Sequence, residues 1–100
     1  MRRGSTYRNT FKVNLDLREA AVFITYSQDE AVIEKTGGDL FVTENEIVTN
    51  LTQEETLRFN DCLKVDIQIR YVMPDGTSDS SNIMTTTVGR ILKDGVIAYG

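Results

Sequence analysis

An unbroken alternation of apolar and polar residues runs from Leu63 to Tyr71, with the sequence LKVDIQIRY. Apolar side chains recur here at every second position, which is the period of a β-strand with one buried face and one solvated face. An amphipathic helix would instead place them three or four positions apart. We therefore predict a half-exposed strand over this stretch and expect its apolar face to lie at the centre of the core.

Shorter segments of similar character flank this strand on both sides. They are rich in β-branched and aromatic residues, and polar or glycine-containing stretches separate them. The loop between Ser27 and Ala31 is too short for a parallel crossover, so its flanking strands are expected to pair antiparallel. The predicted strands cover residues 7–15, 21–27, 31–36, 40–43, 46–51, 63–71 and 83–92, with a short terminal segment at 96–99.

One short helix is predicted near residues 53–59. Thr52 and Glu55 fit a capping box, in which each side chain bonds the backbone N–H of the other residue. We expect Leu57 or Phe59, in the following turn, to close one end of the core.

The arrangement of these elements predicts an all-β fold. About 7–8 short strands at regular spacing, with one helix and no long strand–helix–strand units, are typical of an antiparallel β-sandwich or of a partly closed barrel. We favour the sandwich. With 100 residues in total, the chain is expected to form one β-sandwich domain over residues 7–100, preceded by a flexible basic arm over residues 1–6.

The charges indicate which partners to expect. The chain has 15 acidic and 11 basic residues and a net charge of −4, which disfavours nucleic acid as a partner. Arg2, Arg3 and Arg8 nevertheless cluster in the first eight positions. They are the candidate partner contacts, for an acidic protein surface, although an exposed terminus with solubilising charge is the simpler explanation of the cluster.

The residue inventory disfavours catalysis. The chain contains no histidine and a single cysteine, which excludes Ser-His-Asp and Cys-His machinery and histidine-ligated metal sites. Cys62 is expected to be a small packing residue. The nearest carboxylate pairs, Glu44 with Glu46 and Glu54 with Glu55, are explained by solvation or helix capping. We predict that the protein is not an enzyme and uses no cofactor or metal.

The hydropathy pattern predicts a soluble protein. No segment approaches the roughly 20 apolar residues that span a bilayer, and the first residues do not resemble an export signal. Neither a membrane nor the general secretory route is therefore expected. The threonine run Thr85–Thr87 suits a strand surface, and it also offers a sheet edge through which two copies could pair.

A resemblance to a known group of proteins is carried by five stretches, Met1–Gly4, Ile24–Gln28, Leu51–Thr56, Val65–Arg70 and Asp94–Ile97. The chain resembles small prophage-encoded proteins from bacterial tail-gene clusters, which are similar in turn to the N-terminal anchoring domain of phage upper-baseplate proteins. The likeness spans most of the chain, although Ser5–Thr10 stands where that group has a proline-containing stretch.

This resemblance implies a structural or assembly module of the phage tail or baseplate that acts by protein–protein docking. Its implied partners are other phage structural proteins, with a homo-oligomer through a sheet edge as a further expectation. Its implied location is the bacterial host cytoplasm during assembly, or the virion. The alternative is a carbohydrate- or surface-binding β-sandwich, which the absence of tryptophan disfavours because tryptophan is the usual stacking platform for sugars.

Overall fold

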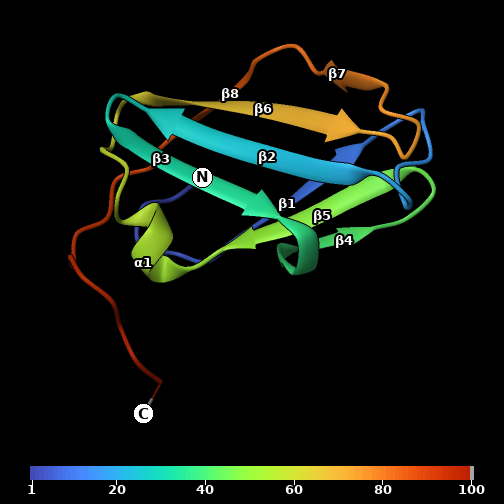
Figure 1. Ribbon diagram of the computed structural model, residues 1–100. Coiled ribbons are helices and arrows are strands. Elements are labelled where there is room, and N and C mark those ends of the chain that lie inside the picture. Colours follow the sequence, from blue (N-terminus) through green and yellow to red (C-terminus); the bar gives the residue numbers. More distant parts are fainter. Residues whose placement is uncertain (100) are drawn as a thin grey trace.

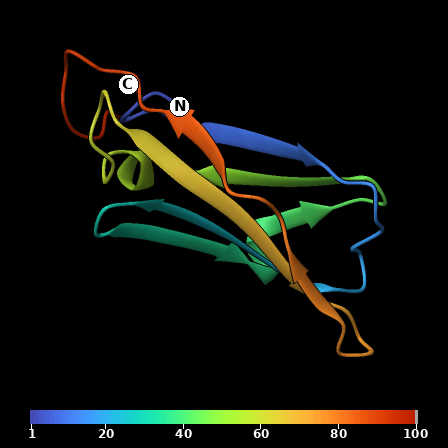
Figure 2. The same ribbon diagram turned by 90° about the horizontal axis from the view of Figure 1, so that it is seen from above.

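The computed structural model describes residues 1–99, in which eight strands form two antiparallel sheets that pack against each other (Figures 1 and 2). The smaller sheet has the strand order β1-β5-β4, and the larger one has the order β3-β2-β6-β7, with β8 also paired to β6. The predicted all-β, two-sheet architecture with one short helix is confirmed. The elements are β1 (Tyr7–Lys12), β2 (Ala21–Gln28), β3 (Ala31–Thr36), the 3-10 turn η1 (Gly37–Asp39), β4 (Leu40–Val42), β5 (Glu46–Leu51), α1 (Gln53–Thr56), β6 (Lys64–Val72), β7 (Ser78–Ser80) and β8 (Met84–Thr87).

The alternating stretch found first in the sequence becomes β6, the longest strand. Val65, Ile67 and Ile69 are buried on its inner face, and β2 pairs along one of its edges. The strand begins one residue later than predicted, because the chain enters it through Cys62 in a left-handed conformation with φ of 63°. Leu63 consequently lies outside the strand and is 47% exposed.

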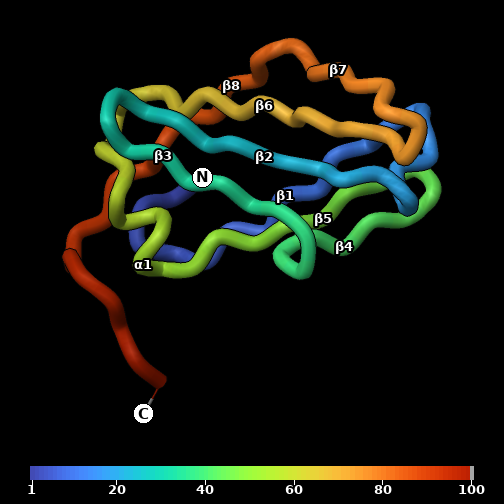
Figure 3. The backbone as a smooth tube through the Cα atoms, viewed as in Figure 1, coloured from blue at the N-terminus to red at the C-terminus, as the bar shows by residue number. Residues whose placement is uncertain are grey.

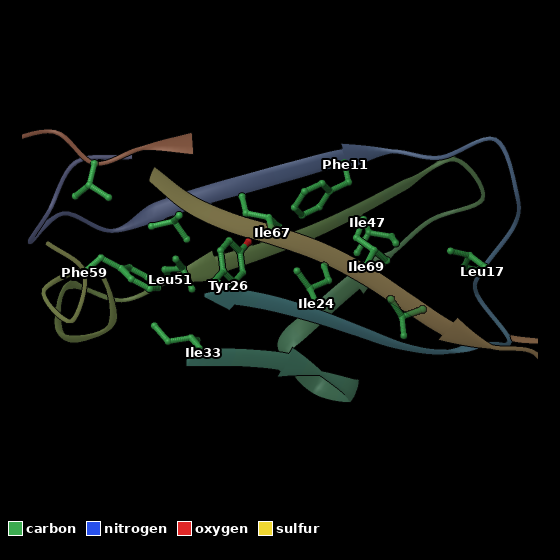
Figure 4. Packing of buried hydrophobic residues seen from close by; sticks show 13 residues of the cluster. Phe11, Leu17, Ile24, Tyr26, Ile33, Ile47, Leu51, Phe59, Ile67 and Ile69 are labelled. Carbon is green, nitrogen blue, oxygen red and sulfur yellow. The ribbon is translucent and has the colours of Figure 1, made fainter. Parts of the chain in front are cut away.

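The core fills the space between the two sheets (Figure 4). Ile24 and Tyr26 of β2 are fully buried, as are Ile47 and Leu51 of β5. Phe59 is also fully buried beside Leu51 at the α1 end, so the prediction of a residue closing one end of the core is confirmed. Removing such a side chain from a well-packed core typically destabilises a protein by about 3–5 kcal/mol.

Helix α1 forms at the predicted capping box but ends sooner than expected. The Thr52 hydroxyl accepts a hydrogen bond of 3.2 Å from the Glu55 N–H, and the Glu55 carboxylate accepts one of 2.9 Å from the Thr52 N–H. Regular helix stops at Thr56, not near residue 59. The chain then turns, and this turn directs Phe59 into the core.

The region after β6 differs most from the prediction. The expected strand over residues 83–92 is only four residues long, and β7 forms in a stretch predicted to be a polar loop. Both short strands pair with the same edge of β6, β7 with residues 70–72 and β8 with residues 64–67. Ser81 fills the interval, because its N–H donates to the Ile69 carbonyl at 2.8 Å and its hydroxyl accepts from the Ile69 N–H at 3.0 Å. The long free edge of β6 therefore orders a segment of low strand propensity.

Candidate protein-docking surfaces

The first residues of the chain lie against the segment that follows β8. The Gly89 N–H donates to the Met1 carbonyl at 2.6 Å, and the Arg3 N–H donates to the Gly89 carbonyl at 3.0 Å. The Met1 ammonium group also donates to the Thr87 carbonyl at 3.1 Å. Residues 1–6, for which the sequence predicts a flexible arm, thus make specific backbone contacts, and their mobility in solution stays a prediction.

Gly4 allows the first residues of the chain to lie close to the segment that follows β8. Its φ of 79° lies in the left-handed region, and a Cβ atom at this position would lie 2.8 Å from Cδ1 of Ile91. The conformation therefore favours glycine, and an added Cβ would also force the end of the Ile91 side chain to move.

Arg3 joins three segments of the chain. Its Nε donates to the Phe59 carbonyl at 3.0 Å and its Nη2 donates to the Leu57 carbonyl at 3.2 Å. Its Nη1 forms an ion pair with Asp94, and this hydrogen bond holds the pKa of Asp94 below its usual value. The guanidinium group is therefore used within the chain, where it ties the first residues to the end of α1 and to the C-terminal region.

The three predicted partner contacts, Arg2, Arg3 and Arg8, lie in different environments. Arg2 is exposed beside Gly89, with which it forms a parallel bridge. Arg8 is exposed on the outward face of β1, opposite Asn50 of β5. Only Arg2 and Arg8 thus present their charge outward, because Arg3 is engaged.

Two further cations lie near Arg2. Arg90 and Lys93 are exposed, and within residues 1–99 neither they nor Arg2 form an ion pair. We call Arg2, Arg90 and Lys93 the basic patch. Sequence reasoning missed the last two residues, because only the bridge between Arg2 and Gly89 brings them beside the first residues of the chain.

A run of exposed apolar residues follows the basic patch. The C-terminal segment, Leu92–Tyr99, leaves the body beside α1 (Figure 3), and Leu92 and Tyr99 are 95% and 109% exposed. Val96 and Ile97 are also exposed. The sequence predicts a terminal strand at 96–99, but within residues 1–99 no strand forms there, and the backbone of Ile97 bonds the side chain of Gln53 instead.

A groove opens at the opposite end of the molecule. There β1 and the loop after it diverge from β6 and β7, leaving a cavity of about 530 Å³ that we call the end groove. Most of its wall is apolar, and its floor includes the core residues Leu17 and Ile69. The residues that line it include Val13, Leu15 and Leu17 on one side, and Ile69, Tyr71 and Ser80 on the other.

Charged side chains of both signs lie at the end groove, since Lys12 is among the residues that line it and acidic side chains stand on the loops around it. The loop after β1 lies against the β4–β5 turn, since the Val13 N–H donates to the Asn45 carbonyl at 2.9 Å. Asp16 is paired with Arg18, and this hydrogen bond lowers the pKa of Asp16. Four other carboxylates of these loops and of the β6–β7 hairpin are exposed and form no ion pair within residues 1–99. These residues, which we call the acidic rim, are Glu19, Glu44, Asp75 and Asp79.

The outward face of the larger sheet carries two adjoining shallow pockets. They share Thr25 and Arg70, and their volumes are about 250 and 380 Å³. Phe23 and Glu34 line the first pocket, and Asp66 lines the second. Such a mixture of donors, acceptors and aromatic residues suits a hydroxyl-rich ligand.

The carboxylate pairs noted in the sequence have different environments. Glu55 is bound by the Lys35 ammonium at 2.8 Å as well as by the Thr52 N–H. Partial burial raises the pKa of Glu55, but the hydrogen bonds from Lys35 and Thr52 outweigh that effect and keep the pKa below its usual value. Glu54 is exposed, as is Glu44 in the β4–β5 turn. Glu55 therefore serves in capping and ion pairing.

Cys62 is exposed, so the prediction that it is a packing residue is wrong. Its N–H donates to the Val88 carbonyl at 3.1 Å, which holds its backbone beside the end of β8. Its positive φ forms part of the turn into β6 and directs the thiol to solvent.

The remaining features concern metals, membranes and known proteins. Within residues 1–99, no three side chains among Cys, Asp and Glu gather in a group that could hold a metal ion. In the same part of the chain, no helix is long and apolar enough to cross a membrane. Comparisons with protein families, with curated proteins and with solved structures find no match to this chain. Any assignment of function therefore rests on the sequence itself and on the surfaces described above.

Proposed function

We propose that this chain is a structural or assembly module of the phage tail or baseplate type, which acts by docking to other proteins and performs no catalysis. The observation that carries the docking role is the C-terminal segment, in which four large apolar side chains are exposed within eight residues. Contiguous apolar surface of this kind marks interaction sites in folded proteins. The basic patch beside it adds an electrostatic means of selecting the partner.

The phage assignment rests on the sequence resemblance. It names other phage structural proteins as partners, and it implies action in the bacterial cytoplasm during assembly or in the finished particle. A small acidic module with exposed apolar and basic surfaces is suited to such a role, because a rigid sandwich positions its surfaces without further folding on binding.

The first experiment tests docking directly. The purified chain is mixed with each structural protein encoded beside its gene, and complexes are detected by size-exclusion chromatography followed by mass spectrometry. We expect one of these proteins to form a stoichiometric complex. Failure to bind any of them would overturn the proposal, and absence of the chain from purified particles would restrict it to assembly.

The outward face of the larger sheet favours a second candidate function, carbohydrate binding. Its first pocket places Arg70 and Glu34 beside Phe23, and its second pocket adds Asp66, a combination that can bind and orient sugar hydroxyls. A glycan array tests this function. Binding that Arg70→Ala abolishes, and that the matched outward-facing variant Arg8→Ala leaves intact, would favour it over docking.

A further inference from the structure

We infer that the C-terminal segment of one copy occupies the end groove of a second copy, so that copies join head to tail. This inference rests on the proposed docking function and names one partner for it, a second copy of the chain.

The C-terminal segment has the properties of a strand that lacks a neighbour. Val96, Ile97 and Tyr99 are residues of high strand propensity, and they are exposed. The backbone of Ile97 is hydrogen-bonded to the side chain of Gln53. In a sheet the same backbone groups would bond to the backbone of a neighbouring strand. An exposed, extended apolar segment of this kind binds most readily to an edge or groove of another sheet.

The end groove offers the complementary surface. Its floor consists of Leu17 and Ile69, which belong to the hydrophobic core, so apolar side chains inserted there would extend that core. Its volume of about 530 Å³ lies within the range of roughly 300–1,000 Å³ that is usual for occupied binding pockets. One wall consists of Lys12, at the end of β1, and of the loop that follows it.

Charge complementarity indicates that the occupant is a second copy. The basic patch stands at the root of the C-terminal segment, and the acidic rim surrounds the end groove. Insertion of the segment brings the three cations of the basic patch towards the four carboxylates of the acidic rim, which outnumber the cations at that end, Lys12 and the paired Arg18. Because each copy has a net charge of −4, two copies repel each other in most orientations. The orientation that brings the basic patch to the acidic rim is therefore favoured over the others.

The dimensions of the molecule exclude insertion within one chain. The C-terminal segment leaves the molecule beside α1, and the loop after β1, which lines the end groove, lies at the other end (Figure 1). The longest dimension of the molecule is 47 Å. Eight extended residues reach at most about 27 Å, at about 3.4 Å each. The contact must therefore be made between copies, and because its two halves differ, it can repeat from copy to copy.

Sedimentation velocity over a range of concentrations tests the inference. We expect wild-type protein to associate as concentration rises and to dissociate as salt is added. A segment variant, Ile97→Asp with Tyr99→Ser, and a groove variant, Leu15→Asp, should each associate at least about tenfold more weakly, because each removes one half of the contact. Ile97, Tyr99 and Leu15 are all exposed, so circular dichroism should show both variants folded.

Mixing the two variants supplies the decisive measurement. The segment variant keeps an intact groove and the groove variant keeps an intact segment, so their mixture should form a one-to-one dimer that cannot grow further. The matched control is Phe41→Ser, which removes an apolar side chain that is 67% exposed on β4, outside both surfaces, and should associate like wild type.

Substitutions that reverse charges in the acidic rim and the basic patch test the same contact in a second way. Asp75→Lys with Asp79→Lys should weaken association without disturbing the core, and adding Lys93→Glu should restore part of it. A wild-type protein that stays monomeric up to about 1 mM, or a variant mixture that forms no dimer, would overturn the inference. A monomeric chain that still binds a tail protein would leave the proposed function standing.

Discussion

The side-chain amide of Gln53 is hydrogen-bonded twice to the backbone of Ile97, donating to its carbonyl at 3.1 Å and accepting from its N–H at 2.9 Å. Gln28 binds the backbone of Asn60 in the same manner, at 3.0 and 2.6 Å. In both places a glutamine amide takes the position of a peptide group in a neighbouring strand. The two pairs differ in burial, since Gln28 is 6% exposed and the bonds of Gln53 are exposed.

Replacing Gln53 by alanine should release the C-terminal segment without unfolding the body. The two bonds are exposed, so global stability should change by less than about 1 kcal/mol. The Ile97 amide should then exchange its hydrogen faster, as measured by NMR or mass spectrometry. Unchanged exchange in Gln53→Ala would show that these bonds do not hold the segment. Gln28→Ala is the buried counterpart and should instead lower global stability by roughly 1–3 kcal/mol.

Gly4→Ala should destabilise the protein by roughly 1–3 kcal/mol. The substitution places an L-residue at a φ of 79° and brings its Cβ within 2.8 Å of Cδ1 of Ile91. The control is Gly38→Ala, because Gly38 has no positive φ and no atom within 4 Å of the added Cβ. Urea unfolding of both variants makes the comparison. Equal stability of the two would contradict the close packing of Gly4.

Tyr26 should make stability depend on pH in the alkaline range. Burial raises the pKa of its hydroxyl to about 12, although the hydrogen bond from Asn9 opposes this shift. The unfolded chain ionises near the ordinary value of 10.0, so the unfolding free energy should be constant below that pH and fall as pH rises towards about 12. Urea unfolding at a series of pH values measures this slope, and Tyr26→Phe should reduce it. A slope that is the same in both proteins would assign the effect to other groups.

Cys62 should react with a thiol reagent in the folded protein. The thiol is exposed in the turn before β6, so maleimide labelling should proceed at nearly the same rate with and without urea. Val65→Cys in a Cys62→Ser background gives the matched buried thiol, because Val65 is fully buried. Protection of Cys62 comparable to that of this second thiol would contradict the exposed placement.

The strands that could be predicted from the sequence are those whose pattern is local. The alternation in Val65–Tyr71 and the short loop between β2 and β3 specify neighbouring elements, and both predictions are confirmed. The capping residues of α1 act within one turn, which explains why Thr52 and Glu55 were identified correctly.

The parts that could not be predicted depend on contacts between distant residues. β7 is polar throughout and forms because β6 offers it a long free edge. Arg3 was grouped with Arg2 and Arg8 by position, but its role depends on Leu57, Phe59 and Asp94, which only the fold brings near. Likewise, the end groove arises where two sheets diverge, and no local pattern records that divergence.

The two sheets are connected differently along their two sides. On one side η1 leads directly from β3 of the larger sheet to β4 of the smaller one, so three residues fix their separation. On the other side β1 and β8 share no ladder, and the Arg2–Gly89 bridge lies only at one end. Thermal fluctuations should therefore separate the two sheets first on the side of β1 and β8. Water should reach the core past Leu17 before it reaches the core along η1.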